Sequence, residues 1–371
     1  MQVSASEPRI IHLIAGARPN FMKIAPLFHA LRKEAWARPL IIHTGQHYGA
    51  NMSDSFFTDL ELPQPDFSLG VGSGTHAEQT ARVMLAYEKI CLQEPPHLVV
   101  VVGDVNSSLA CALVAAKLGI QLAHLEAGLR SFDRAMPEEL NRIVIDTLAD
   151  WLWTHCADAD QNLAREGVEA AKIKRVGNIM IDSLEMLRPK IETAETHLEF
   201  KLKPQEYMLA TLHRPSNVDD LSNLQKIAKL LGELGRKIAV IFPIHPRTRK
   251  NMESSNIDPN RIEGVLLCDP LPYRKFMSLL FNCKLVLTDS GGIQEETTYL
   301  GIPCLTLREN TERPVTITLG TNRLCNLENA FQFCCQTLES PRPSAKVPEF
   351  WDGNTAARVV LELRRLFSNA S

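Results

Sequence analysis

The chain lacks a hydrophobic run long enough to cross a membrane. Its longest apolar stretches, such as residues 98–102 and 109–116, are far shorter than the ~20 residues that a membrane helix needs. The first residues, MQVSASEPR, also lack the basic segment and following apolar segment of a signal peptide. We therefore expect no membrane partner.

Cysteine spacing typical of a zinc site or a redox motif is also absent. The nine cysteines are scattered without a CxxC pair, and the adjacent Cys334 and Cys335 are poorly placed to bridge. No set of histidines and acidic residues has metal-ligand spacing, and neither a Walker loop nor a GxSxG elbow occurs. We expect reduced thiols in a cytoplasmic protein that uses no metal, no cofactor and no covalent nucleophile.

The chain has no large excess of charge of either sign. Because 40 Lys and Arg face 43 Asp and Glu, the net charge is only −3, which does not favour nucleic acid as a partner. The 371 residues, 45% of them hydrophobic, have the size and composition of a globular protein with two domains.

What the sequence does contain is a regular alternation of strand and helix patterns. Short apolar runs bounded by turns are each followed by helical spacing, as in parallel strands buried on both faces. We expect strands at 10–15, 40–44, 98–102, 121–125, 151–154 and 173–176, and then at 207–211, 238–243, 265–268, 284–287 and 303–307. The pattern predicts an α/β fold of two doubly wound, Rossmann-like domains with the active site in the cleft between them.

The domain boundary is expected near residues 176–182, where the first series of strands ends. We predict an N-terminal domain over 1–179 and a C-terminal domain over 180–351. An amphipathic pattern over 355–367 predicts a helix in the tail, 352–371, that packs back on the first domain.

The segment 288–296, TDSGGIQEE, is the most informative in the chain. Ser290, Gly291 and Gly292 would lie on the turn between a strand and a helix, where open backbone N–H groups suit a phosphate. Glu295 and Glu296, one turn later, could accept hydrogen bonds from ribose hydroxyls. The alternative is a tight turn whose acidic residues only complement the helix dipole.

Cations and carboxylates follow the predicted strands of the first domain. Arg18 and Lys23 would lie at the start of a helix, where the dipole disfavours cations unless an anion is bound; otherwise they are surface residues. Asp104, Glu126 and Glu138 follow strands or begin a helix. Asp104 and Glu138 have alternative explanations as a helix cap and a first-turn acid. No capping rule requires Glu126, and three converging carboxylates predict proton transfer.

Two strands of the second domain end in histidine and arginine. They lead into His213-Arg214 and into His245-Pro246-Arg247. A lone histidine is more often a structural group. Two such endings opposite a phosphate turn favour a role in binding or catalysis.

Eight separated motifs occur in an order that closely resembles the non-hydrolysing UDP-N-acetylglucosamine 2-epimerases. They are GARPNFMKIAP (16–26), TGQH (44–47), VGD (102–104), HLEAGLR (124–130), MPEELNR (136–142), TLHRPSN (211–217), TDSGGIQEE (288–296) and NTERP (310–314). The resemblance covers roughly residues 9–330. It implies a two-domain GT-B fold, a homodimer and a UDP-sugar substrate.

The resemblance also implies roles for particular residues. The diphosphate would bind at Ser290, Gly291 and Gly292 and near Arg18 and His213, the last of which would also assist catalysis. Glu296 would hold the ribose and the backbone at Phe276 the uracil, while Lys23 and Arg313 match further contacts of the nucleotide sugar. Asp104, Glu126 and Glu138 match the acid/base carboxylates. The reaction would eliminate UDP to give a 2-acetamidoglucal and then add UDP back.

This chain departs from common family patterns at several positions. Asn20 stands where many members have glutamate, the histidine motif begins with Leu212, and Leu271 replaces a glutamine of some members. Three other functions remain open at this point. They are a hydrolysing epimerase that releases UDP and N-acetylmannosamine, a GT-B glycosyltransferase, and a silent nucleotide-sugar sensor.

Overall fold

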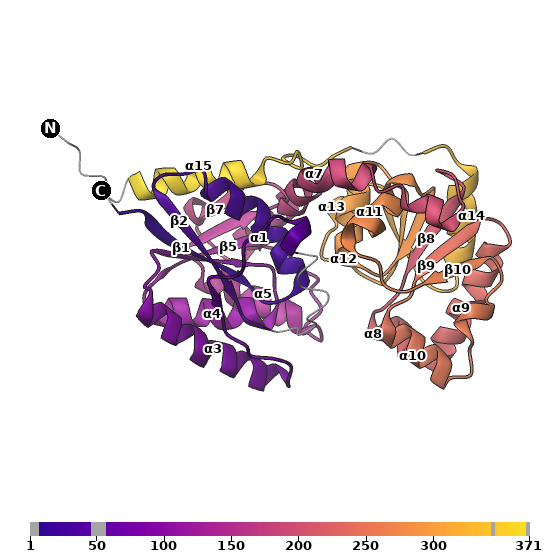
Figure 1. Ribbon diagram of the computed structural model, residues 1–371, viewed down its shortest axis with the longest axis horizontal. Helices are drawn as coiled ribbons and strands as arrows, with labels where there is room; N and C mark the ends of the chain where they lie inside the picture. The colour runs from indigo at the N-terminus through magenta and orange to yellow at the C-terminus, as the bar shows by residue number, and fades with distance from the viewer. Residues whose placement is uncertain (1–6, 46–56, 343–345, 369–371) are drawn as a thin grey trace. The chain divides into compact units, whose positions relative to one another are not determined.

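The computed structural model describes residues 7–45, 57–342 and 346–368. The chain divides into two compact units, Met1–Met186 with Glu349–Ser371 and Leu187–Pro348 (Figure 1). We call these the first and second unit. The division lies within helix α7 (Ile179–Glu192), a few residues after the boundary expected from the sequence.

The first unit is built on a parallel sheet of seven strands in the order β3-β2-β1-β4-β5-β6-β7. The strands are β1 (Arg9–Ala15), β2 (Ala37–His43), β3 (Phe67–Ser68), β4 (Leu98–Val102), β5 (Gln121–Ala127), β6 (Trp151–Thr154) and β7 (Ile173–Arg175). β4, LVVVV, is buried at every residue, as expected of a central strand covered on both faces.

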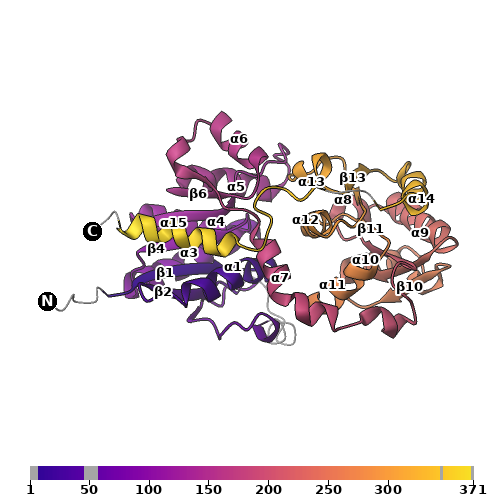
Figure 2. The same ribbon diagram turned by 90° about the horizontal axis from the view of Figure 1, so that it is seen from above.

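Helices cover both faces of this sheet. One face carries α3 (His76–Gln93), α4 (Asn106–Lys117) and α5 (Pro137–Leu148), and the other carries α1 (Arg18–Leu31) and α15 (Thr355–Ser368) (Figure 1). α6 (Ala157–Arg165) lies beside β6 and β7 (Figure 2). Residues of β1, β4 and β5 interleave with those of α3 and α4 in one apolar core.

The C-terminal helix α15 packs against α1. Its first turn is capped by Asp182, whose carboxylate accepts hydrogen bonds from the backbone N–H groups of Thr355 (3.1 Å) and Ala356 (2.8 Å). The segment before it inserts Trp351, which is 1% exposed and donates from Nε1 to His155 O. These contacts make the tail part of the first unit.

The second unit repeats the scheme with a parallel sheet of six strands, β10-β9-β8-β11-β12-β13. Its strands are β8 (Tyr207–Thr211), β9 (Ala239–Pro243), β10 (Val265–Cys268), β11 (Leu285–Thr288), β12 (Cys304–Leu307) and β13 (Asn322–Cys325). Its helices are α8 (Pro215–Val218), α9 (Leu221–Gly235), α10 (Pro246–Ser254), α11 (Tyr273–Asn282), α12 (Gly291–Leu300), α13 (Val315–Thr318) and α14 (Ala330–Glu339).

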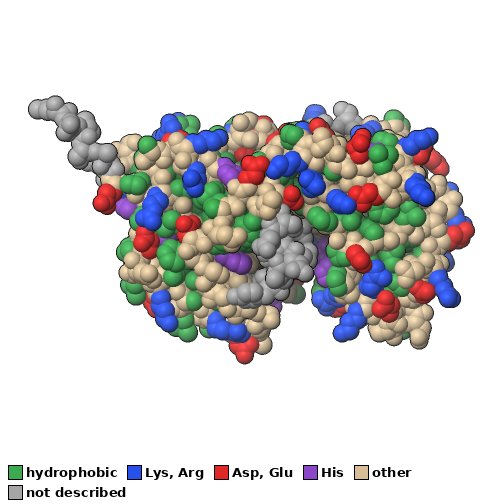
Figure 3. Space-filling model, viewed as in Figure 1, with side chains coloured by type: hydrophobic (Ala, Val, Ile, Leu, Met, Phe, Trp, Pro, Cys, Tyr) green, Lys and Arg blue, Asp and Glu red, His purple; other side chains and the backbone are tan. Residues whose placement is uncertain are grey.

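The predicted α/β class with two doubly wound sheets is confirmed. Several short elements were not expected from the sequence, among them β3, β13, α6, α10, α11 and α14. α7 and the short 3₁₀ helix Thr196–Phe200 connect β7 to β8. None of the described helices is both long and apolar enough to span a bilayer. On the face seen in Figure 3, cationic and anionic side chains are interspersed.

Candidate active site

The strand ends of the first unit bring two of the predicted carboxylates to the carboxyl edge of its sheet. Asp104 follows β4 after Gly103, whose φ of 62° is in the left-handed region. Glu126 is the penultimate residue of β5. β4 and β5 are hydrogen-bonded neighbours, so the two residues end adjacent strands.

Glu126 forms an ion pair with Lys23. Lys23 Nζ lies 2.6 Å from Glu126 Oε2, and both side chains are almost fully buried. Glu126 has φ 77°, which a non-glycine residue rarely adopts. The pairing of β5 with β6 is irregular at this point, with a register shift between Leu125 and Ala127. Such a bulge re-aims a side chain that a regular strand would direct elsewhere.

Asp104 is held by an arginine and is not a helix cap. Its Oδ2 accepts from Arg142 Nε at 3.1 Å, whereas α4 begins after Val105 without a side-chain cap. Arg142 also donates to Glu139 at 3.0 Å. The Glu139 carboxylate accepts from the backbone N–H and the hydroxyl of Ser131 as well. Glu139 therefore fixes the loop that precedes α5.

Glu138 is placed differently from the other two predicted carboxylates. It is exposed on the first turn of α5 and forms no hydrogen bond or ion pair with the described residues. Its side chain is free to turn toward a ligand. The side chain of Arg18 is not among the described parts of the structure, and neither are Gln46 and His47 of the second motif.

Asn20, where many family members have glutamate, forms three hydrogen bonds. Its Oδ1 accepts from the backbone N–H groups of Gly16 (3.2 Å) and Ala17 (2.8 Å), and its Nδ2 donates to Val102 O (2.9 Å). A glutamate has no N–H to make the third bond. Asn20 thus ties the end of β4 to the start of α1.

The turn between β11 and α12 of the second unit lies where the sequence predicted it. Ser290 is the N-cap residue of α12, and its N–H donates to Thr288 Oγ1 at 3.0 Å. A Cβ added at Gly291 would lie 2.8 Å from Arg313 Nη1, whereas one added at Gly292 would meet no described atom within 4 Å. The Glu312 carboxylate would lie 2.9 Å from the Cβ added at Gly291, so the turn is lined by Arg313 and Glu312 on one side and open at Gly292.

Arg313 is held by two buried carboxylates. Its Nε lies 2.9 Å from Glu295 Oε1, and its Nη1 donates to Glu312. Glu312 also pairs with Arg308 at 2.8 Å. Burial raises the pKa of Glu312, but Arg313 and Arg308 outweigh it and hold that pKa well below its usual range. The sequence suggested Glu295 as a ribose ligand, whereas the structure shows it paired with Arg313.

His213 is paired with a buried aspartate. Its Nδ1 lies 3.0 Å from Asp289 Oδ1, and the ring is partly exposed. Asp289 also accepts from the backbone N–H of Arg214 at 2.9 Å and from Asn217 Nδ2 at 3.0 Å. Burial raises the pKa of Asp289, but His213 and the hydrogen bonds from Arg214 and Asn217 together outweigh it and leave the pKa below its usual value.

His245, the other histidine that the sequence singled out, has the contacts of a structural residue. His245 caps α10 by accepting from Arg247 N at 3.2 Å, and Arg247 pairs with Asp219. Burial lowers the pKa of His245, and His213, whose ring centroid is 5.8 Å away, lowers it further.

Glu296 lies in a pocket that favours its protonated form. Burial raises its pKa to about 7, although a hydrogen bond from the Tyr273 hydroxyl (2.7 Å) opposes the shift. Tyr273 begins α11, and Phe276 follows in the same helix. The Phe276 N–H donates to Pro272 O at 3.0 Å, so any base contact of this backbone would use another atom.

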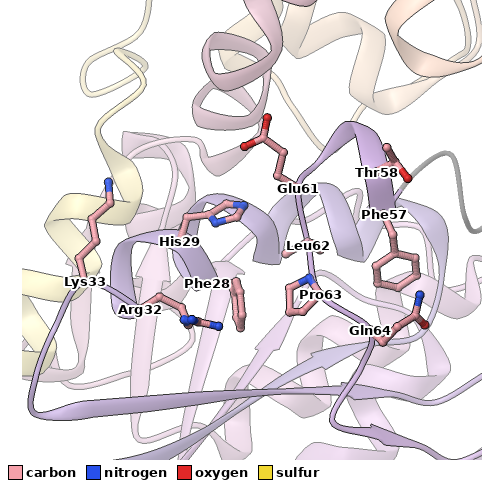
Figure 4. A pocket seen from close by; sticks show the side chains of 10 residues that line it. All are labelled: Phe28, His29, Arg32, Lys33, Phe57, Thr58, Glu61, Leu62, Pro63 and Gln64. Carbon is pink, nitrogen blue, oxygen red and sulfur yellow. The ribbon is translucent and has the colours of Figure 1, made fainter.

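Three further observations bear on the site. No group of three metal-binding side chains occurs within the residues the structure covers. A cavity of about 770 Å³ beside α1 is lined by none of the predicted site residues (Figure 4). Sequence reasoning also assigned no role to several buried charged groups, because a motif does not show which of its residues are buried: His124, Asp146, Glu139, Asp289 and Glu312.

Comparisons with known proteins agree with the predicted resemblance. The family model described as UDP-N-acetylglucosamine 2-epimerase matches residues 29–364. The chain is 44% identical over 323 residues to the UDP-N-acetylglucosamine 2-epimerase of Methanocaldococcus jannaschii, covering 85% of this chain and 87% of the relative. It is 42% identical over 315 residues to the UDP-2,3-diacetamido-2,3-dideoxy-D-glucuronate 2-epimerase of Pseudomonas aeruginosa, covering 84% and 86%.

Solved structures extend the agreement to the fold. The crystal structure of the M. jannaschii UDP-GlcNAc 2-epimerase in complex with UDP-GlcNAc and UDP matches with a TM-score of 0.88 at 41% identity, covering 96% of this chain and 99% of that one. A glycosyltransferase from Streptomyces sp. SF2575, in complex with thymidine diphosphate, matches with a TM-score of 0.51 at 17% identity over 97% and 96% of the two chains. The second match shows a shared GT-B-like fold alone. The predicted family is confirmed: the chain belongs to the UDP-N-acetylglucosamine 2-epimerases.

Proposed function

We propose that this chain epimerises UDP-N-acetylglucosamine at C2, reversibly, to UDP-N-acetylmannosamine. The observation that carries the proposal is the buried Lys23–Glu126 ion pair at the end of β5, beside the strand that leads to Asp104. A relative at 41% identity binds UDP-GlcNAc and UDP. We infer that this chain does so as well.

The first step would be an elimination. A carboxylate of the first unit takes the proton from C2, the C1–O bond breaks, and its electron pair leaves with UDP. The product is a 2-acetamidoglucal with a double bond between C1 and C2. This route avoids a free carbanion, because the electrons of the C2–H bond form the double bond as UDP departs.

The second step would reverse the first on the other face of the sugar. A protonated group delivers a proton to C2 from the opposite side, and a UDP oxygen attacks C1. The two faces of C2 require more than one acid/base group, and we assign Asp104, Glu126 and Glu138 to these roles. The Lys23 ammonium lies 2.6 Å from Glu126 Oε2 and holds that carboxylate in place.

The second unit would bind the nucleotide. The diphosphate would lie at Ser290, Gly291 and Gly292, where the start of α12 presents N–H groups and Arg313 adds a cation. Arg18 and His213 would contact the same group. His213, oriented by Asp289, would stabilise the charge that grows on UDP as it leaves. Glu296 would accept from the ribose hydroxyls, and the Phe276 segment would contact the uracil.

A modified substrate is the second candidate function. The P. aeruginosa relative, at 42% identity, is a 2-epimerase of UDP-2,3-diacetamido-2,3-dideoxy-D-glucuronate. The same elimination and addition at C2 would act on that sugar. Only groups that contact C3 and C6 would separate the two substrates, so both should be assayed.

Proton NMR of the purified protein with UDP-N-acetylglucosamine in D₂O tests the proposal. We expect the N-acetylmannosamine epimer of the nucleotide sugar to appear with deuterium at C2. Free N-acetylmannosamine and UDP would instead identify a hydrolysing epimerase. An unchanged sugar without an acceptor would favour a glycosyltransferase, and binding without turnover would indicate a sensor.

Assembly and location complete the proposal. Homodimerisation follows the pattern of the family and is checked by light scattering in solution. The nine free cysteines fit a reducing cytoplasm.

A further inference from the structure

His124 is a buried histidine whose two ring nitrogens both face hydrogen-bond acceptors. It lies on β5 and has no exposed surface. Its Nδ1 is 2.6 Å from Asp146 Oδ1, and its Nε2 is 3.1 Å from Gly103 O. A neutral imidazole has one donor and one acceptor nitrogen, so it satisfies only one of these partners. The imidazolium, with two donors, satisfies both.

The charges around His124 balance only when the ring is cationic. Asp146 pairs with Arg130 at 2.7 Å as well as with His124, and Arg130 also forms a two-point contact with Glu166. With a cationic ring, the network holds two cations, His124 and Arg130, and two anions, Asp146 and Glu166. Burial raises the pKa of Asp146, but His124 and Arg130 outweigh it and keep that pKa low, so a carboxylate is present to receive the ring proton.

This network fixes the two strand ends that carry the assigned carboxylates. Gly103, which directly precedes Asp104, accepts from His124 through its carbonyl and donates from its N–H to Leu125 O at 3.1 Å. Gly128 N donates to Asp146 Oδ2 at 3.1 Å. Glu126, with its unusual φ of 77°, lies between these two anchored points. The backbone on each side of it is therefore held by a hydrogen bond.

We propose that His124 is held permanently as an imidazolium and acts as a positioning residue, joining the turn before Asp104 to Asp146 and so fixing the geometry of Asp104 and Glu126. This inference rests on the proposed acid/base roles of those two carboxylates. His124 itself touches no reacting atom. Its charge is what allows one side chain to bind a carbonyl and a carboxylate at the same time.

His12 provides a matched control in the same sheet. It lies on β1, is equally buried, and its Nδ1 is 3.1 Å from the Tyr87 hydroxyl. Burial lowers the pKa of His12 to about 4, and no carboxylate contacts it among the described residues. His12 is therefore neutral at pH 8, and among the described residues its ring does not face the two acceptors that the His124 ring faces.

Nitrogen NMR of the wild-type protein labelled with ¹⁵N-histidine tests the charge directly. At pH 8 we expect His124 to give two protonated ring nitrogens and His12 to give one, with each signal assigned by its loss in the His124→Gln or His12→Gln variant. A neutral ring at His124 would overturn the proposal. This measurement needs no activity, so it stands even if the proposed function fails.

The kinetic test uses the same two variants. Glutamine presents one donor end and one acceptor end, so His124→Gln loses one of the two anchors. We expect kcat to fall about 10- to 100-fold through misplacement of the carboxylates, while calorimetry shows UDP affinity within about twofold of wild type because His124 touches none of the groups proposed to bind the nucleotide. His12→Gln should keep its kcat. A normal kcat in His124→Gln would contradict a positioning role. A loss of UDP affinity as large as the loss of kcat would contradict it as well. An inactive wild-type enzyme would instead count against the proposed function.

Discussion

Lys23 and Glu126 come from different elements, α1 and β5, and meet as a buried ion pair with 2.6 Å between Nζ and Oε2. Removing one partner of such a pair leaves a buried charge facing a neutral side chain. We expect Lys23→Met to lower the free energy of unfolding by about 3–5 kcal/mol. Urea denaturation measures this. The double variant Lys23→Met/Glu126→Gln should recover part of the loss, and two additive effects would show that the pair is not coupled.

The amide variants Asp104→Asn, Glu126→Gln and Glu138→Gln test the catalytic assignment. Each amide keeps the shape of the side chain but cannot carry the proton. Turnover should fall by about 10²–10⁴-fold, with little change in UDP affinity. The exposed Glu88→Gln on α3 is the control. If only Glu138→Gln keeps normal turnover, Glu138 is not an acid/base group. It then serves only as an acidic residue in the first turn of α5.

Binding of the nucleotide sugar should depend on pH through Glu296, whose pKa in the free protein is about 7. Below that pH the group is protonated, and it must lose its proton before it can accept from both ribose hydroxyls. Affinity should therefore fall up to about tenfold for each pH unit below 7.

Calorimetry with UDP-N-acetylglucosamine, in the inactive Glu126→Gln background, measures this dependence. UDP itself is unsuitable because its terminal phosphate titrates in the same range. Adding Glu296→Gln should remove the dependence and weaken binding by about 1.5–3 kcal/mol, the contribution of a charged hydrogen bond. A pH-independent affinity in the Glu126→Gln background would show that Glu296 does not hold the ribose.

The same carboxyl group should affect the stability of the ligand-free protein. A folded-state pKa raised above the ordinary value gives stability that is present at low pH and is lost as pH rises through 7. Glu296→Gln should therefore be more stable than wild type at pH 8, by on the order of 1–3 kcal/mol, and similar to it at pH 5. Thermal unfolding at the two pH values checks the sign. Tyr273→Phe removes the hydroxyl that donates to Glu296. In that background, Glu296→Gln should stabilise the protein at pH 8 by more than it does in the wild-type background.

His213 and His245 should respond differently to the same substitution. His213→Asn removes a ring that Asp289 orients toward the proposed diphosphate, so both turnover and UDP affinity should fall. His245→Asn keeps the ability to cap α10 and should change neither. Steady-state kinetics and calorimetry on the pair provide the comparison. Equal effects of the two variants would place His213 in the same structural role as His245.

The sequence by itself determined the class of fold and the family. Strands such as β4 and β11 are predicted directly from their apolar runs, because a strand buried on both faces must be continuously apolar. Turn residues such as Gly291 and Gly292 follow from local backbone geometry, which neighbouring residues decide. Short helices such as α10 and α11 were missed because their stability comes from packing, not from local pattern.

Only the tertiary structure decided which charged groups are partners. Glu126 and Lys23 are far apart in the chain, and so are Glu295 and Arg313. No local rule pairs them. The structure also separated Glu138, which is exposed, from Glu139, which is buried and fixes a loop. Burial and charge pairing depend on the whole surrounding fold, because the cost of desolvating a charge is met only by groups that folding brings close.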